Sequence, residues 1–105
     1  MVVADRAALA AVRRLRGRKI LFSNAPAHYV HAMLDLLGIG SLFAAVYAIE
    51  HVRYQPKPSL EGFRRLLRAE RVVARRAVMV DDSLPNLRAA RRLGIVSELR
   101  GEASL

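Results

Sequence analysis

Cysteine and tryptophan are absent from this 105-residue sequence, and acidic residues, aromatic residues and long apolar runs are scarce. The absence of cysteine excludes disulfide frameworks and metal sites built on thiolates. No apolar run approaches the ~18 residues that a membrane-spanning helix needs, so we do not expect a membrane protein. Near the start, Asp5 and Arg6 interrupt the apolar stretch that a secretory signal requires. A cytoplasmic location is the resulting expectation.

Positive charge is in excess, with 18 basic and 9 acidic residues and a formal net charge of +9. One interpretation is a surface for nucleic acid, because clustered arginine neutralises phosphates. The other is that arginines cover solvated helix faces, since pairs such as Arg13-Arg14, Arg64-Arg65 and Arg91-Arg92 recur at helical positions. We favour the second interpretation, because few aromatic residues are present to stack bases. We therefore do not expect nucleic acid as a partner. The positive charge still predicts a general affinity for anions.

Apolar residues make up 53% of the chain, which is typical of a globular protein. The length fits a single domain, which we place at residues 1–105. Short apolar runs alternate with stretches of helical periodicity, and this order predicts parallel strands with helices on both faces of the sheet. The fold class is therefore α/β, a Rossmann-like three-layer core. Strands are expected at 19–23, 46–49, 77–80 and 95–99, and helices at 5–15, ahead of Gly38, after the loop 55–59, and at 84–93.

Polar side chains follow three of the expected strands. Ser23 and Asn24 follow the first, Lys57 lies in the loop after the second, and Asp81 and Asp82 follow the third. In parallel sheets ligands bind at the carboxyl ends of the strands, so these loops are expected to meet. Carboxylates suit Mg²⁺, and a lysine with a hydroxyl suits phosphate. Each group also has a simpler interpretation, since Ser23 can cap a helix and Lys57 can belong to a rigid turn between prolines.

Three segments resemble motifs of one known family. LFSN, QPKP and VMVDDSLPNLRAARRLG are similar to motifs II, III and IV of the haloacid dehalogenase superfamily, in the same order. The resemblance covers about residues 5–99 and is strongest to the pyrimidine 5′-nucleotidase-like hydrolases, through FSNAPAHYVHAMLDLLGI and DDSLPNL. It implies a Mg²⁺-dependent phosphatase that acts on a small phosphate monoester, with a nucleoside monophosphate as a candidate.

The resemblance also implies a role for each matching residue. Ser23 would bind the transferring phosphoryl group together with the backbone N–H of Asn24. Lys57 would neutralise charge between nucleophile and phosphate, and Ser23 and Lys57 are therefore the expected catalytic residues. Asp81 and Asp82 would hold Mg²⁺. Such an arrangement stabilises a phosphoryl transition state electrostatically.

One family motif is missing. The family attacks phosphorus with the first aspartate of a DxD motif at the end of the central strand, and no DxD occurs here. Asp5 is the one candidate, with Ala7 in place of the second aspartate, and it is either a helix cap or a degenerate nucleophile. Asn86, one helical turn beyond the aspartate pair, is placed to steady their loop.

Without that motif, we expect the central nucleophile strand and the cap domain to be absent, leaving two inner strand edges unpaired. The chain would then be the C-terminal part of a hydrolase core, completed by an N-terminal segment or a second chain. The alternative, from another class, is a non-catalytic module that binds phosphate or nucleic acid through its arginine surface.

Overall fold

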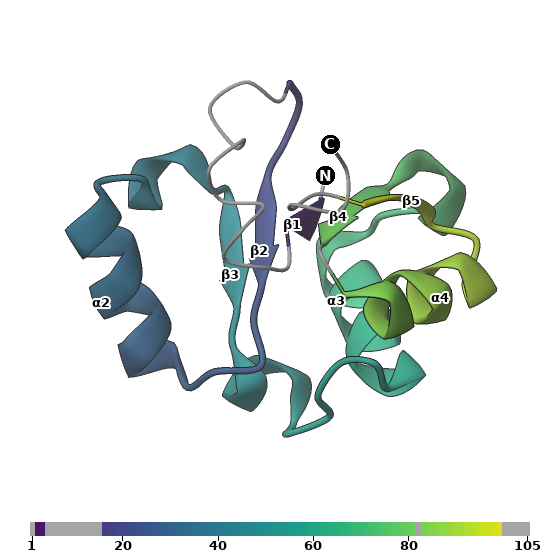
Figure 1. Ribbon diagram of the computed structural model, residues 1–105, viewed down its shortest axis with the longest axis horizontal. Coiled ribbons are helices and arrows are strands. Elements are labelled where there is room, and N and C mark those ends of the chain that lie inside the picture. Colours follow the sequence, from purple (N-terminus) through teal and green to yellow (C-terminus); the bar gives the residue numbers. More distant parts are fainter. Residues whose placement is uncertain (1, 4–15, 82, 100–105) are drawn as a thin grey trace.

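The computed structural model describes residues 2–3, 16–81 and 83–99. Five parallel strands form one sheet in the order β3-β2-β1-β4-β5 (Figure 1). The strands are β1 (Val2–Val3), β2 (Ile20–Phe22), β3 (Ala45–Tyr47), β4 (Val78–Asp81) and β5 (Val96–Leu99). The α-helices in the described part of the chain are α2 (Ala27–Leu37), α3 (Leu60–Glu70) and α4 (Leu84–Arg92), and the 3₁₀ turns are η2 (Gly40–Leu42), η3 (Ile49–Val52) and η4 (Ala74–Arg76).

Helices cover both faces of this sheet, which confirms the expected three-layer α/β core. Side chains alternate across a strand, so Ile20 and Phe22 of β2 join the core beneath α3 and α4, whereas Leu21 packs on the α2 side. In Figure 1, α2 lies on one side of the strands and α3 and α4 on the other. None of the helices in the described ranges is long and apolar enough to cross a membrane.

The centre of the sheet differs from the expectation drawn from the sequence. We expected the position between β2 and β4 to be vacant, and that prediction is wrong, because β1 occupies it. Val2 pairs with Ile20 and Met79, and Val3 pairs with Leu21 and Val80. Two valines are too short a run to be recognised as a strand, and only the neighbours on both sides make them one. Asp5 and the helix expected at 5–15 lie outside the described residues.

The other expected elements are confirmed with small shifts at their ends. The largest shift is in β3, which ends at Tyr47 although the apolar run extends to Ile49. The chain turns into η3 at Ile49 instead, because Nδ1 of His51 accepts the N–H of Ala48 at 2.9 Å. This local hydrogen bond competes with continued strand pairing. The turn then ends at Arg53, which has a left-handed backbone conformation.

A glycine in α3 allows the 55–59 loop to reach the sheet. A Cβ added at Gly62 would lie 2.4 Å from the backbone oxygen of Gln55 and 3.2 Å from the ring of Phe22. Both neighbours are held in place, since one is backbone and the other is a buried ring that also packs edge-on against Phe63. The close approach of helix and loop therefore requires the absence of a side chain at this position.

Replacing this glycine tests that contact. We expect Gly62→Ala to lower the free energy of unfolding by about 1–3 kcal/mol, the usual range for overpacking a core. Gly40→Ala is the matched control, because its Cβ would meet Leu34 at an ordinary 3.7 Å. Urea unfolding of both variants makes the comparison, and equal stability of the two would show that the loop yields to the added methyl group.

A carboxylate from η3 caps the start of α2. Both side-chain oxygens of Glu50 accept the N–H of Ala27, at 2.9 and 3.2 Å. Hydrogen bonds from the backbone N–H groups of Glu50 and Ala27 lower the pKa of the Glu50 carboxyl from its ordinary value of 4.5. Negative charge is favourable there, because the N-terminal N–H groups of a helix carry partial positive charge.

The lowered pKa predicts a pH dependence of stability. A carboxyl with a lower pKa in the folded state stabilises the fold above its unfolded pKa, and this contribution disappears as the pH falls through the folded pKa. We expect Glu50→Gln to flatten the loss of stability below pH 4.5, as followed by thermal unfolding at a series of pH values. Asp35→Asn, which removes an exposed carboxylate on α2 itself, is the control. An unchanged acid profile in Glu50→Gln would contradict the cap.

Candidate active site

The side chain of Lys57 lies inside the protein at the carboxyl end of the sheet. Lys57 is 7% exposed, and its Nζ donates a hydrogen bond of 3.1 Å to the backbone oxygen of Phe22. The same Nζ lies 3.7 Å from Oδ2 of Asp81 and 5.4 Å from the centroid of the Phe22 ring. A buried ammonium is costly unless it is compensated. Here a carbonyl, a carboxylate and an aromatic face compensate it.

Asp81 is fully buried, with an exposed fraction of 0%, at the last position of β4. Its Oδ1 accepts the N–H of Ser83 at 2.9 Å, and its Oδ2 accepts Nδ2 of Asn86 at 3.0 Å. Ser83 is also the N-cap of α4, because its Oγ accepts the N–H of Asn86. The start of α4 therefore orients the Asp81 carboxylate, and the Asn86 contact agrees with the role that the family resemblance implies.

Asn24 acts through its side chain on the loop that carries Lys57. Oδ1 of Asn24 accepts the N–H of Lys57 at 2.8 Å, and Nδ2 of Asn24 donates to the Lys57 carbonyl at 3.1 Å. The two bonds join the end of β2 to the backbone at Lys57, where the peptide bond to Pro58 is cis. The family resemblance implies a role only for the backbone N–H of Asn24, so this side-chain clamp was not expected. A pair of hydrogen bonds across 33 residues leaves no signal in local sequence.

Ser23 lies between Phe22 and Asn24, and both of these neighbours contact Lys57. Its N–H donates to the carbonyl of Tyr47 at 2.9 Å and so continues the pairing of β2 with β3. Its Oγ accepts the N–H of Ala25 at 3.1 Å, which fixes the hydroxyl oxygen at the strand end. A hydroxyl that accepts one hydrogen bond retains its own hydrogen as a donor.

The Asp81 carboxylate is an oxygen ligand of the kind that Mg²⁺ prefers. Mg²⁺ is commonly held by one or two carboxylates together with water and substrate phosphate, so a complete protein cage is not required. Each carboxylate oxygen of Asp81 has two acceptor positions, and Oδ1 uses one of them on Ser83. Within the described ranges, no group of three or more His, Cys, Asp or Glu side chains is placed to hold a metal. Asp82, the second expected ligand, lies outside those ranges.

The family of the chain follows from the match of its sequence to known families. The profile of the haloacid dehalogenase-like hydrolases matches residues 2–94. The chain therefore belongs to the haloacid dehalogenase-like hydrolase family. The comparison with curated proteins found no match.

Solved structures share the fold at low sequence identity. An uncharacterised protein from Corynebacterium glutamicum has a TM-score of 0.72 and 22% identity, over 97% of this chain and 85% of its own. An enzyme of the family from Bacteroides thetaiotaomicron, in complex with magnesium and inorganic phosphate, has a TM-score of 0.68 and 20% identity, over 87% of this chain and 50% of its own. A predicted phosphoglycolate phosphatase from Haemophilus somnus has a TM-score of 0.71 and 22% identity, over 85% of this chain and 39% of its own. The chain thus spans most of the first of these proteins and half or less of the other two.

The buried ion pair can be tested by removing its cation. Lys57→Met leaves the Asp81 carboxylate buried without its cation, and we expect a loss of about 3 kcal/mol in the free energy of unfolding, as for other broken buried pairs. Removing the carboxylate as well, in Lys57→Met/Asp81→Asn, is expected to recover part of that loss. Lys19→Met is the control, because the Lys19 side chain makes an exposed contact with Gly17. Urea unfolding compares the stabilities of the unchanged chain and the three variants, and a double variant no more stable than Lys57→Met would argue against the ion pair.

Proposed function

We propose that this chain supplies the phosphate- and Mg²⁺-binding part of a phosphatase that acts on a small phosphate monoester. The observation that carries the proposal is the buried Lys57, whose ammonium lies beside the Asp81 carboxylate at the carboxyl edge of the sheet. A cation fixed in a water-poor site stabilises phosphoryl charge without reorganising during the reaction. Belonging to a hydrolase family agrees with this chemistry.

In this proposal each described residue has a distinct role. Lys57 attracts the phosphate oxygens, and the Ser23 hydroxyl donates a hydrogen bond to one of them. Asn24 holds the Lys57 backbone, and Asn86 orients the Asp81 carboxylate. Asp81, with Asp82, would hold Mg²⁺, which when bound neutralises phosphate charge.

The substrate that we propose first is a nucleoside monophosphate, on the resemblance to the pyrimidine 5′-nucleotidase-like hydrolases. The similarity in fold to a predicted phosphoglycolate phosphatase makes 2-phosphoglycolate the second substrate to test. Both are small phosphate monoesters, so they present the same group to Lys57 and Ser23. They differ in the group that is esterified to the phosphate, which is a nucleoside in one and glycolate in the other.

Binding of inorganic phosphate tests the site without requiring turnover. We expect Mg²⁺-dependent phosphate binding by the purified chain in calorimetry, and a loss of at least tenfold in affinity in Asp81→Asn. Asp35→Asn, a change to an exposed carboxylate on α2, is expected to bind like the unchanged chain. Phosphate binding that ignores both Mg²⁺ and Asp81→Asn would contradict the proposal.

Phosphate release from a panel of nucleoside monophosphates and 2-phosphoglycolate, with and without Mg²⁺, then separates the possible nucleophiles. Release that is lost in Asp5→Asn identifies Asp5 as the nucleophile, whereas release that survives in this variant assigns the step to another group or to a contaminant. If the chain supplies only the Mg²⁺- and phosphate-binding part of an active site, we expect it to bind inorganic phosphate but to release none from these substrates.

The alternative function, binding of nucleic acid, is favoured by one observation. Exposed arginines gather on the α3, η4 and α4 side of the sheet, whereas α2 carries no lysine or arginine. The exposed members are Arg64, Arg68, Arg71, Arg75, Arg76, Arg88, Arg91 and Arg92. Binding to arbitrary DNA or RNA that falls steeply with salt and is unchanged in Asp81→Asn would support this function over hydrolysis.

A further inference from the structure

A cavity lies at the opposite edge of the sheet from the candidate active site. It is lined by residues that precede and begin β2 and β4, among them Arg18, Ile20, Arg76 and Ala77. Because the strands are parallel, these residues mark the amino edge, whereas Lys57 and Asp81 lie at the carboxyl edge. The cavity has a volume of about 350 Å³, at the lower end of the range for small-molecule pockets.

The wall of this cavity is apolar and largely built from the core. Ile20, Leu66 and Ala77 are buried residues of the core beneath α3 and α4, and Val72 packs against the same core. Val72 and Val78 of the lining are only partly buried, and an apolar body that covers them removes apolar area from water.

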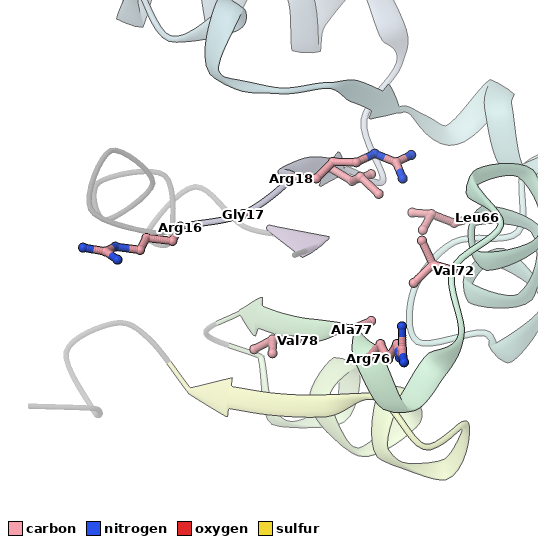
Figure 2. A pocket seen from close by; sticks show the side chains of 9 residues that line it. Arg16, Gly17, Arg18, Leu66, Val72, Arg76, Ala77 and Val78 are labelled. Atoms are coloured by element: carbon pink, nitrogen blue, oxygen red, sulfur yellow. The ribbon is translucent and has the colours of Figure 1, made fainter.

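Arginines stand around the apolar wall. Figure 2 shows the guanidinium groups of Arg18 and Arg76 on either side of Leu66 and Val72, whereas Arg16 points away from them. Arg18 forms a salt bridge with the carboxylate of Glu70. The same carboxylate accepts a hydrogen bond from the hydroxyl of Tyr47. Arg76 is exposed and has no salt bridge to another described residue. A guanidinium presents paired N–H donors that fit an oxyanion.

We propose that this cavity is a second binding site, for a small oxyanion with an apolar body. The apolar part lies against Val72 and Val78, and the anionic head is held by Arg76. The head is a carboxylate or a phosphate, since both match the geometry of the guanidinium. The site is separate from the Lys57 and Asp81 site, so its occupancy does not depend on the proposed hydrolase activity.

Binding of three probes with the same tail tests the proposal. We expect octyl phosphate and octanoate to bind the purified chain in calorimetry, and octanol to bind at least tenfold more weakly because it lacks the charge. The stronger of the two anions identifies the preferred head group. In the absence of Mg²⁺, on which binding at the proposed phosphatase site depends, amide chemical shifts are expected to change at Ala77 and Val78 rather than at Lys57 and Asp81.

Two arginine variants with the same loss of charge locate the anchor. We expect Arg76→Gln to weaken binding of octyl phosphate about tenfold, the effect of losing a charged hydrogen bond of about 1.4 kcal/mol. Arg88→Gln, a change to an exposed arginine on α4, should bind as tightly as the unchanged chain. Equal affinity in Arg76→Gln and the unchanged chain, equal weakening in both variants, or octanol binding as tightly as octyl phosphate would each overturn the proposal.

Discussion

The described structure depends most on one constraint, the burial of Lys57 together with Asp81. Neither charge is tolerated inside a protein without partners, so the residues around them have to converge. The end of β2 supplies the Phe22 carbonyl and the Asn24 clamp, and the start of α4 supplies Ser83 and Asn86. Gly62 allows the loop that carries Lys57 to approach α3 closely. Three segments far apart in sequence are thereby held at one edge of the sheet.

The same convergence explains how an apolar strand can end in the buried carboxylate of Asp81. Asp81 is stabilised within the described structure by a nearby cation and two hydrogen bonds from N–H groups, so its charge is compensated before any metal is considered. Bound Mg²⁺ would add to this compensation rather than replace it. The arginine-lined cavity lies at the other edge, so the two anion sites that we propose are separated by the length of the strands.

Much of the fold could be predicted because its signals are local. Helical periodicity identified α2, α3 and α4, and apolar runs identified β2, β4 and β5 close to their observed ends. β1 was missed because two valines have no periodicity of their own, and β3 was extended too far because the His51 turn was not foreseen. Within the candidate active site, Lys57 and Asp81 could be predicted from their positions after strands and from the motifs that contain them. The Phe22 carbonyl was missed because a backbone group has no residue-specific signal.

By itself, the sequence determined the α/β class, the order of the elements and the residue types at the strand ends, because each depends on neighbours within a few positions. Tertiary structure decided which of those residues meet. It placed β1 between β2 and β4, brought Lys57 to within 3.7 Å of Asp81, and turned the Asn24 side chain onto the Lys57 backbone. The physical reason is that burial and hydrogen bonding act between segments tens of residues apart. Which of these distant segments contact one another is decided only when the sheet has formed.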